Sequence, residues 1–184
     1  MSYSFPQESK GLGYAPAEVD EFIGRARRQF EDPSQFLVSS GLARHATFSL
    51  VKGGYSIAAV ETAIDRLEDT FAQKELAKQR AELGDFALDD RLARFVESLQ
   101  KRIDRPAGKR FSRASWPLRG YAPKQVDAFC QNLERFLVAG ATLTAADVRG
   151  ELFRAKRGGY AENQVDAFLD RAIEVIQLRK ALGK

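Results

Sequence analysis

Few residues of this chain belong to the types that usually carry catalysis. The sequence has one histidine, His45, and one cysteine, Cys130, and they stand in different halves of the chain. A thiol nucleophile needs a base within hydrogen-bonding reach, and a zinc site needs a cluster of cysteine and histidine ligands. The adjacent carboxylates Asp89 and Asp90 stand at the start of a helical pattern, where negative charge is favoured without any catalytic role. The sequence therefore predicts a non-enzymatic protein with no metal site and no cofactor.

The strongest pattern is a Gly-Tyr pair that recurs four times. A valine stands five residues after each tyrosine, and an acidic residue follows each valine. The four sets are Gly13, Tyr14, Val19 and Asp20; Gly54, Tyr55, Val60 and Glu61; Gly120, Tyr121, Val126 and Asp127; and Gly159, Tyr160, Val165 and Asp166. Each valine is followed after three or four positions by an apolar residue, namely Phe22, Ile64, Phe129 and Phe168. Each tyrosine is preceded after seven to ten positions by a phenylalanine, namely Phe5, Phe48, Phe111 and Phe153.

The four copies alternate in two kinds. The first and third carry a proline two residues after the tyrosine, at Pro16 and Pro123, whereas the second and fourth have a double glycine before it. The chain therefore reads as a duplicated pair, over about residues 5–80 and 111–180, with corresponding positions offset by 105 to 107 residues. Repeats of this kind bury their apolar faces against one another.

Each motif leads into a predicted amphipathic helix, because apolar residues follow it at helical spacing. A long helix is expected over residues 57–83, a second over about 88–104 after Gly84, and a short one over 144–153. Extended pieces are expected only around 48–51 and 111–115. The predicted fold is mainly α, with four turn-plus-amphipathic-helix repeats arranged as a duplicated pair, short lead-in helices and little or no β structure. The expected domains are residues 1–80, a connecting helix and linker over 81–110, and residues 111–184.

Charge divides unevenly between the halves. Residues 1–104 carry 14 Lys and Arg against 17 Asp and Glu, a net charge of −3, whereas residues 105–184 carry 15 against 8, a net charge of +7. A basic half can meet an anionic lipid surface, a nucleic acid or an acidic partner, or it can simply be solvated. No apolar run approaches the length that spans a bilayer. The N-terminal residues lack the pattern of a secretory signal. We expect a cytoplasmic protein.

The third copy, from Leu118-Arg119-Gly120-Tyr121 through Val126-Asp127-Ala128-Phe129, resembles the N-terminal domain of the DivIVA family, bacterial scaffolds of cell division and polar growth. The fourth copy is similar, and the resemblance covers nearly all of the chain except about residues 81–110. It implies a helical protein-binding domain. It also implies membrane targeting through an apolar residue and an arginine before Gly-Tyr. The third copy keeps that pair as Leu118-Arg119, whereas the others have Gly11-Leu12, Lys52-Gly53 and Arg157-Gly158. No heptad pattern resembles the long coiled-coil tail of the family.

Each motif residue has two interpretations. The four tyrosines either form a repeated recognition surface or pack their rings on the following helix. Asp20, Asp127 and Asp166 either contact a partner or interact with the positive end of a helix. Trp116, Leu118 and Arg119 either touch a membrane surface or, for the two apolar residues, belong to the core.

The sequence thus favours a non-enzymatic adaptor of DivIVA-domain type. Its partners would be unidentified proteins, with a role in cell division or envelope growth as the resemblance implies, and a location in the cytoplasm or at the inner face of the membrane. The alternative is a binder of anionic surfaces or nucleic acid through the basic C-terminal half. Nucleic acid is the less favoured ligand, because no Arg-rich recognition helix or aromatic interleaving stands out. Self-association is left open.

Overall fold

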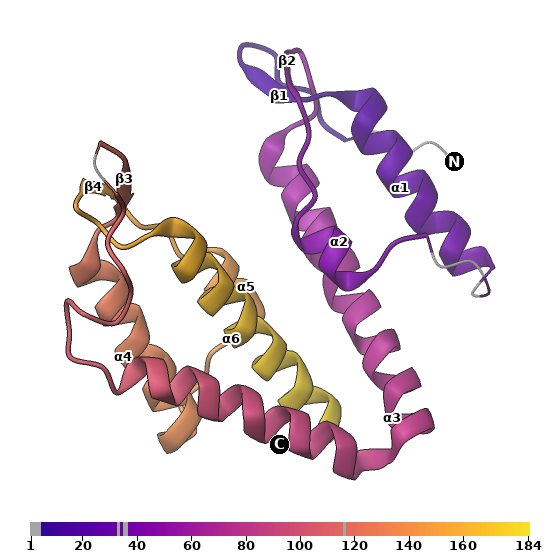
Figure 1. Cartoon of the computed structure of the whole chain (residues 1–184). Coiled ribbons are helices and arrows are strands. Elements are labelled where there is room, and N and C mark those ends of the chain that lie inside the picture. The colour runs from indigo at the N-terminus through magenta and orange to yellow at the C-terminus, as the bar shows by residue number, and fades with distance from the viewer. Residues whose placement is uncertain (1–4, 33, 35–36, 116) are drawn as a thin grey trace. The chain divides into compact units, whose positions relative to one another are not determined.

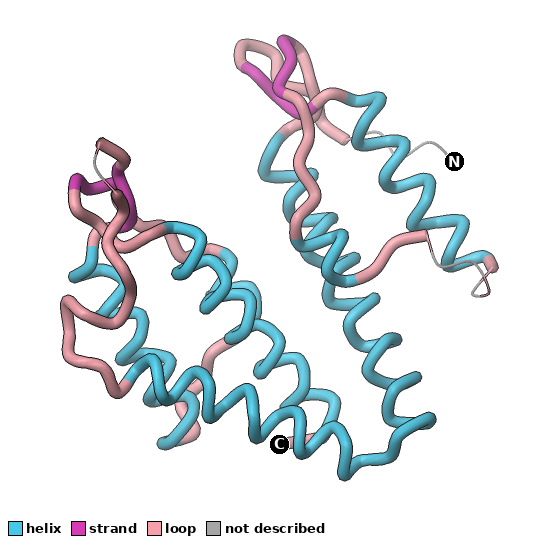
Figure 2. The backbone as a smooth tube through the Cα atoms, in the orientation of Figure 1, coloured by secondary structure: helices cyan, strands magenta, loops and turns pink. Residues whose placement is uncertain are grey.

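A computed structural model describes residues 5–32, 34, 37–115 and 117–184. In this part of the chain there are six helices and four short strands (Figures 1 and 2). In order they are β1 (Leu12–Tyr14), α1 (Pro16–Glu31), α2 (Ser40–Arg44), β2 (Leu50–Lys52), α3 (Ile57–Ile103), β3 (Arg119–Tyr121), α4 (Pro123–Ala139), α5 (Ala145–Arg149), β4 (Ala155–Arg157) and α6 (Glu162–Leu182). The prediction of a mainly helical protein is confirmed.

The chain forms two compact units, Met1–Lys78 and Gln79–Lys184. Their boundary falls within α3, a few residues before Gly84. That glycine leaves the helical conformation with φ 80° and ψ 168°, which few other residues adopt without strain. The expected break between two helices therefore lies at Gly84, and the second part of α3 belongs to the second unit. Each unit is described by itself below.

Local chemistry accounts for the helix boundaries. Pro16 and Pro123 occupy the first turns of α1 and α4, where a missing N–H costs nothing. Thr144 and Asp147 form a reciprocal capping box that starts α5. Helix α5 ends at Arg149, earlier than predicted, because Gly150 follows and glycine is a poor helix former. Helix α2 carries no motif residue, and the sequence did not predict it.

The first unit has a core built from the helical positions that follow its two Gly-Tyr pairs. Val19, Phe22, Val60 and Phe71 are buried in it, together with Val38 from the segment before α2. One buried charge, Glu68 on α3, forms an ion pair with Arg44 of α2 at 2.8 Å. This pair fixes α2 against α3, since a buried carboxylate is tolerated only when it is paired.

The second unit has a larger core. Its Gly-Tyr copies contribute Val126, Leu133, Tyr160 and Val165, all fully buried, and α6 adds Val175 and Leu178. The second part of α3 buries one face here, with Leu88, Leu92, Leu99 and Ile103 each less than 9% exposed. The first unit has no corresponding helix among its described residues.

Candidate functional site at the paired Gly-Tyr strands

In each unit, the first Gly-Tyr pair lies on one strand of an antiparallel pair, and the second Gly-Tyr pair follows the other strand. Strand β1 pairs with β2, and β3 pairs with β4, with Gly13 opposite Val51 and Gly120 opposite Lys156. Beyond the strands, the two tyrosines of a unit exchange backbone hydrogen bonds. The Tyr14 N–H donates to the Tyr55 carbonyl at 2.9 Å and the reverse bond is 2.8 Å, and Tyr121 and Tyr160 exchange bonds of the same lengths. The two Gly-Tyr motifs of each unit are therefore hydrogen-bonded to each other through their backbones.

The glycine before each tyrosine is required by close backbone contact. A Cβ on Gly13 would collide with the backbone of Gly54 and Tyr55, and a Cβ on Gly54 would collide with that of Gly13 and Tyr14. In the second unit, Gly120 and Gly159 approach each other in the same way. The first glycine of each Gly-Gly sequence is favoured for a different reason. Gly53 and Gly158 have positive φ values of 68° and 61° in turns, with open space around them.

The tyrosine hydroxyls contact the acidic residue of the other copy in the unit. Tyr14 donates to Glu61 at 2.9 Å, and Tyr55 donates to Asp20 at 3.2 Å. Tyr160 donates to Asp127 at 3.0 Å, and Tyr121 interacts with Asp166. The sequence indicated a packing or capping role for these residues but not this exchange, because the pairs are 33 to 47 residues apart.

Burial and these contacts both favour the protonated form of the tyrosines. Burial first, and then the neighbouring carboxylate, raises the pKa of Tyr14 and Tyr55 above the usual value. The same causes raise the pKa of Tyr121 to about 12. The pKa of Tyr160 is also raised, first by burial and also by Asp127, although the Arg110 N–H that it accepts opposes this. A phenol that stays protonated acts as a hydrogen-bond donor and is no base, so these residues are suited to structure.

The phenylalanine that precedes each Gly-Tyr pair also contacts the other copy in its unit. Phe5 packs on the ring of Tyr55 with centroids 5.3 Å apart, and Phe48 packs on Tyr14 at 5.4 Å. In the second unit, Phe111 contacts Tyr160 at 5.2 Å and Phe153 contacts Tyr121 at 5.3 Å. Edge and tilted ring pairs of this kind stabilise beyond their buried area. In all four motif copies, the glycine, the tyrosine and the phenylalanine thus contact the other copy of the same unit.

Asp127 has a further role that the sequence did not reveal. Its carboxylate accepts from the Gly108 N–H at 2.7 Å and from the Arg110 guanidinium at 3.2 Å, in addition to Tyr160. Both Asp127 and Arg110 are about 8% exposed. The predicted linker around Gly108 is therefore held against α4. The signal was weak, because arginine in a Pro-Gly-rich stretch normally indicates a solvated loop.

Cys130 and His45, the two residues with conceivable nucleophilic chemistry, lie in different units. Cys130 is completely buried on α4, and burial is the main cause that raises the pKa of its thiol to about 12. A thiol that stays protonated is a poor nucleophile, so Cys130 acts as a small core residue. His45 is exposed at the end of α2.

The solvent-exposed face of each sheet has its own chemistry. In the first unit, Leu12 and Leu50 are 53% and 51% exposed and lie on the same face of the β1–β2 pair, with Lys52 opposite Leu12. In the second unit, the corresponding face has Arg119 directly opposite Arg157, and Leu118 beside it is 67% exposed. The predicted contact residue Trp116 lies outside the described residues. The exposed leucines of the first unit were not singled out from the sequence.

Within the described residues 5–32, 34, 37–115 and 117–184, no group of three or more His, Cys, Asp or Glu side chains gathers in a way that could hold an ion. Among the described helices, none combines the length and the apolar composition that crossing a bilayer would require.

Comparison with known proteins adds no assignment. No protein-family model, no curated protein and no solved structure matches this chain.

Proposed function

We propose that this chain is a non-enzymatic protein-interaction adaptor of DivIVA-domain type, built as a duplicated pair of Gly-Tyr repeats. Support for the duplication comes from the exchanged contacts. In each unit, both tyrosines bond to each other's backbone, both hydroxyls reach the acid of the other copy, and both phenylalanines pack on the ring of the other copy. Two copies form one folded unit in this proposal, and the chain holds two such units.

The observation that carries the adaptor function is the apolar face of the β1–β2 sheet. The motif glycines, tyrosines and acids are occupied in holding each unit together, so the motif itself offers no reactive group. Leu12 and Leu50 instead lie diagonally across the β1–β2 pair on one face of the sheet, and each is about half exposed. Exposed apolar residues that cluster, rather than stand singly, mark contact surfaces for other proteins. The partner would present an apolar surface of its own.

Photo-crosslinking in the source cells tests this proposal. A benzoylphenylalanine placed at Leu12 or Leu50 is expected to give discrete adducts of reproducible mass, because the partner would cover the sheet face. The same group at Gln73, an exposed position of α3 in the same unit, serves as the matched control. Adducts that are absent, or that form equally from Gln73, would rule out this face as the contact surface.

A second candidate, an anionic surface ligand, is favoured by the β3–β4 sheet. Arg119 and Arg157 are direct cross-strand partners, an arrangement that costs free energy when no anion lies between them. The exposed Leu118 next to them would enter the boundary of a lipid layer while the arginines contact headgroups. This arrangement fits a peripheral contact with an anionic membrane.

Flotation with liposomes tests the second candidate. The native protein is expected to float with anionic vesicles and not with neutral ones. Arg119→Ala should weaken binding about fivefold, because each cation near an anionic surface contributes ~1 kcal/mol. Leu118→Ser should weaken it as well, and Leu12→Ser in the other unit should leave it unchanged. If the native protein stays unbound at low salt, the second candidate is wrong, and the adaptor proposal stands on its own test.

A further inference from the structure

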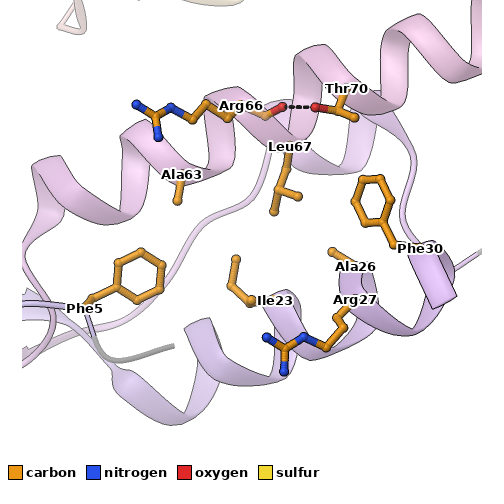
Figure 3. A pocket seen from close by; sticks show the side chains of 9 residues that line it. All are labelled: Phe5, Ile23, Ala26, Arg27, Phe30, Ala63, Arg66, Leu67 and Thr70. Atoms are coloured by element: carbon orange, nitrogen blue, oxygen red, sulfur yellow. Dashed lines mark hydrogen bonds between the residues drawn. The ribbon is translucent and has the colours of Figure 1, made fainter. Parts of the chain in front are cut away.

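The first unit has an open apolar groove between α1 and α3. Figure 3 shows Phe5 and Phe30 at its two ends, with Ala63 and Leu67 of α3 facing Ile23 and Ala26 of α1. The lining residues recur three, four and seven positions apart on each helix, so the groove follows about two turns of both. Its volume is about 400 Å³, and the side chains of Arg27 and Arg66 also line it.

The corresponding surface of the second unit is covered. By the offsets of the duplication, Phe5 corresponds to Phe111, Arg66 to Arg171 and Thr70 to Val175. The second part of α3 contacts two of these counterparts directly. The guanidinium carbon of Arg171 lies 3.8 Å from the centre of the Phe95 ring, and that of Arg102 lies 5.2 Å from the centre of the Phe111 ring. The residues of this helix that follow Gly84 thus bind where the first unit has its groove.

Burial of the lining residues agrees with this difference. Val175 is fully buried, whereas its counterpart Thr70 is exposed. Cys130 is fully buried, whereas its counterpart Ile23 is partly exposed. Among its described residues, the first unit therefore has the same platform of two helices without a third helix that covers it.

We propose that this groove binds an amphipathic helix of a partner protein, in the position that residues 88–103 occupy in the second unit. The expected helix has apolar residues spaced like Leu88, Leu92, Phe95 and Leu99. An aromatic residue would stack on Arg66 as Phe95 stacks on Arg171. Acidic residues would flank the apolar stripe, because Arg27, Arg66 and Lys74 stand around the groove, the last with its ammonium 3.9 Å from the centre of the Phe30 ring.

A partner helix is favoured over a second copy of this chain. The helix of this chain that has the matching stripe is already occupied, since Leu88 and Leu99 are 2% and 1% exposed and its Phe95 and Arg102 contact residues of the second unit. Releasing it would expose that apolar face to water. The inference rests on the adaptor function proposed above and adds a second contact surface, distinct from the β1–β2 sheet, together with the kind of partner that fits it.

Fluorescence anisotropy with a labelled peptide of residues 86–104 and the full-length chain tests the proposal. The peptide is expected to bind saturably, with one site per chain. Thr70→Glu should weaken it about tenfold or more, because a carboxylate in the apolar groove must lose water when the helix binds. Thr62→Glu is the matched control. Both threonines are exposed on α3, and both hydroxyls donate to the carbonyl four residues earlier at 2.7 Å, but Thr70 alone of the two lines the groove.

A double-mutant cycle checks the position of the helix. A peptide with Phe95→Ala should bind the native chain several-fold more weakly than the native peptide does. In a chain that carries Arg66→Ala, the Phe95→Ala change in the peptide should weaken binding much less, because the stacking partner is gone.

The contrary results are distinct from those of the crosslinking experiment. Absence of saturable peptide binding, or equal losses for Thr70→Glu and Thr62→Glu, would overturn the groove proposal while leaving the β1–β2 contact untouched. If sedimentation shows that the native chain dimerises and Thr70→Glu makes it monomeric, the occupant is a second copy and the partner-helix proposal is wrong.

Discussion

Gly159→Ala is expected to lower the free energy of unfolding of the second unit by about 3 kcal/mol or more. The Cβ would collide with the backbone of Gly120 and Tyr121, and no side-chain rotation can relieve a contact between two backbones. The strands would have to separate. The reciprocal hydrogen bonds between Tyr121 and Tyr160, at 2.9 and 2.8 Å, would then lengthen or break.

The adjacent glycine supplies the control for this substitution. Gly158 has φ of 61° and open space around its Cβ position. Gly158→Ala should therefore lower the free energy of unfolding only by the penalty of an alanine in the left-handed conformation, about 1–2 kcal/mol. Urea unfolding followed by circular dichroism compares the two variants, and hydrogen exchange of the Tyr121 and Tyr160 amides locates the damage. Equal losses from the two substitutions would show that the close strand contact is not what the second glycine provides.

Asp127→Asn is expected to destabilise the second unit by about 3 kcal/mol, because it leaves the buried Arg110 guanidinium without its counter-charge. Asp127 also accepts from the Gly108 N–H and the Tyr160 hydroxyl, so the loss reaches the segment before β3 as well as α4. An asparagine keeps the size of the side chain, so the effect reports charge and hydrogen bonding and not a cavity.

Asp20→Asn is the matched substitution in the first unit. Asp20 is exposed and accepts from the Tyr55 hydroxyl at 3.2 Å, so the expected loss is below about 1 kcal/mol. The test compares the midpoints and slopes of urea unfolding for both single variants and for the double variant Arg110→Met/Asp127→Asn. The double variant should recover part of the loss, because a Met–Asn pair buries no unpaired charge. If Asp127→Asn costs no more than Asp20→Asn, the ion pair with Arg110 contributes nothing.

The helices of this protein could be predicted from the sequence because they depend on local pattern. Apolar spacing after each Gly-Tyr pair indicated the four helices that carry the cores, and Gly84 indicated the break in α3 that the structure contains. Glycine marks such breaks since it reaches positive φ without the strain that most other residues incur. The short strands were predicted only near β2, because three-residue strands have too little alternation to be recognised.

The partners of the motif residues were decided by the tertiary structure. The sequence placed Tyr14 close to Asp20, yet the Tyr14 hydroxyl binds Glu61 and Asp20 binds Tyr55, because the strands cross and bring each tyrosine to the helix of the other copy. The same limit applies to the groove in the first unit. The sequence revealed the amphipathic pattern of the second part of α3. It did not reveal that this helix docks on the second unit, or that no equivalent helix covers the described residues of the first unit. Both features depend on contacts between residues far apart in the chain. Periodicity reports which face of a helix is apolar, and only the fold determines what covers that face.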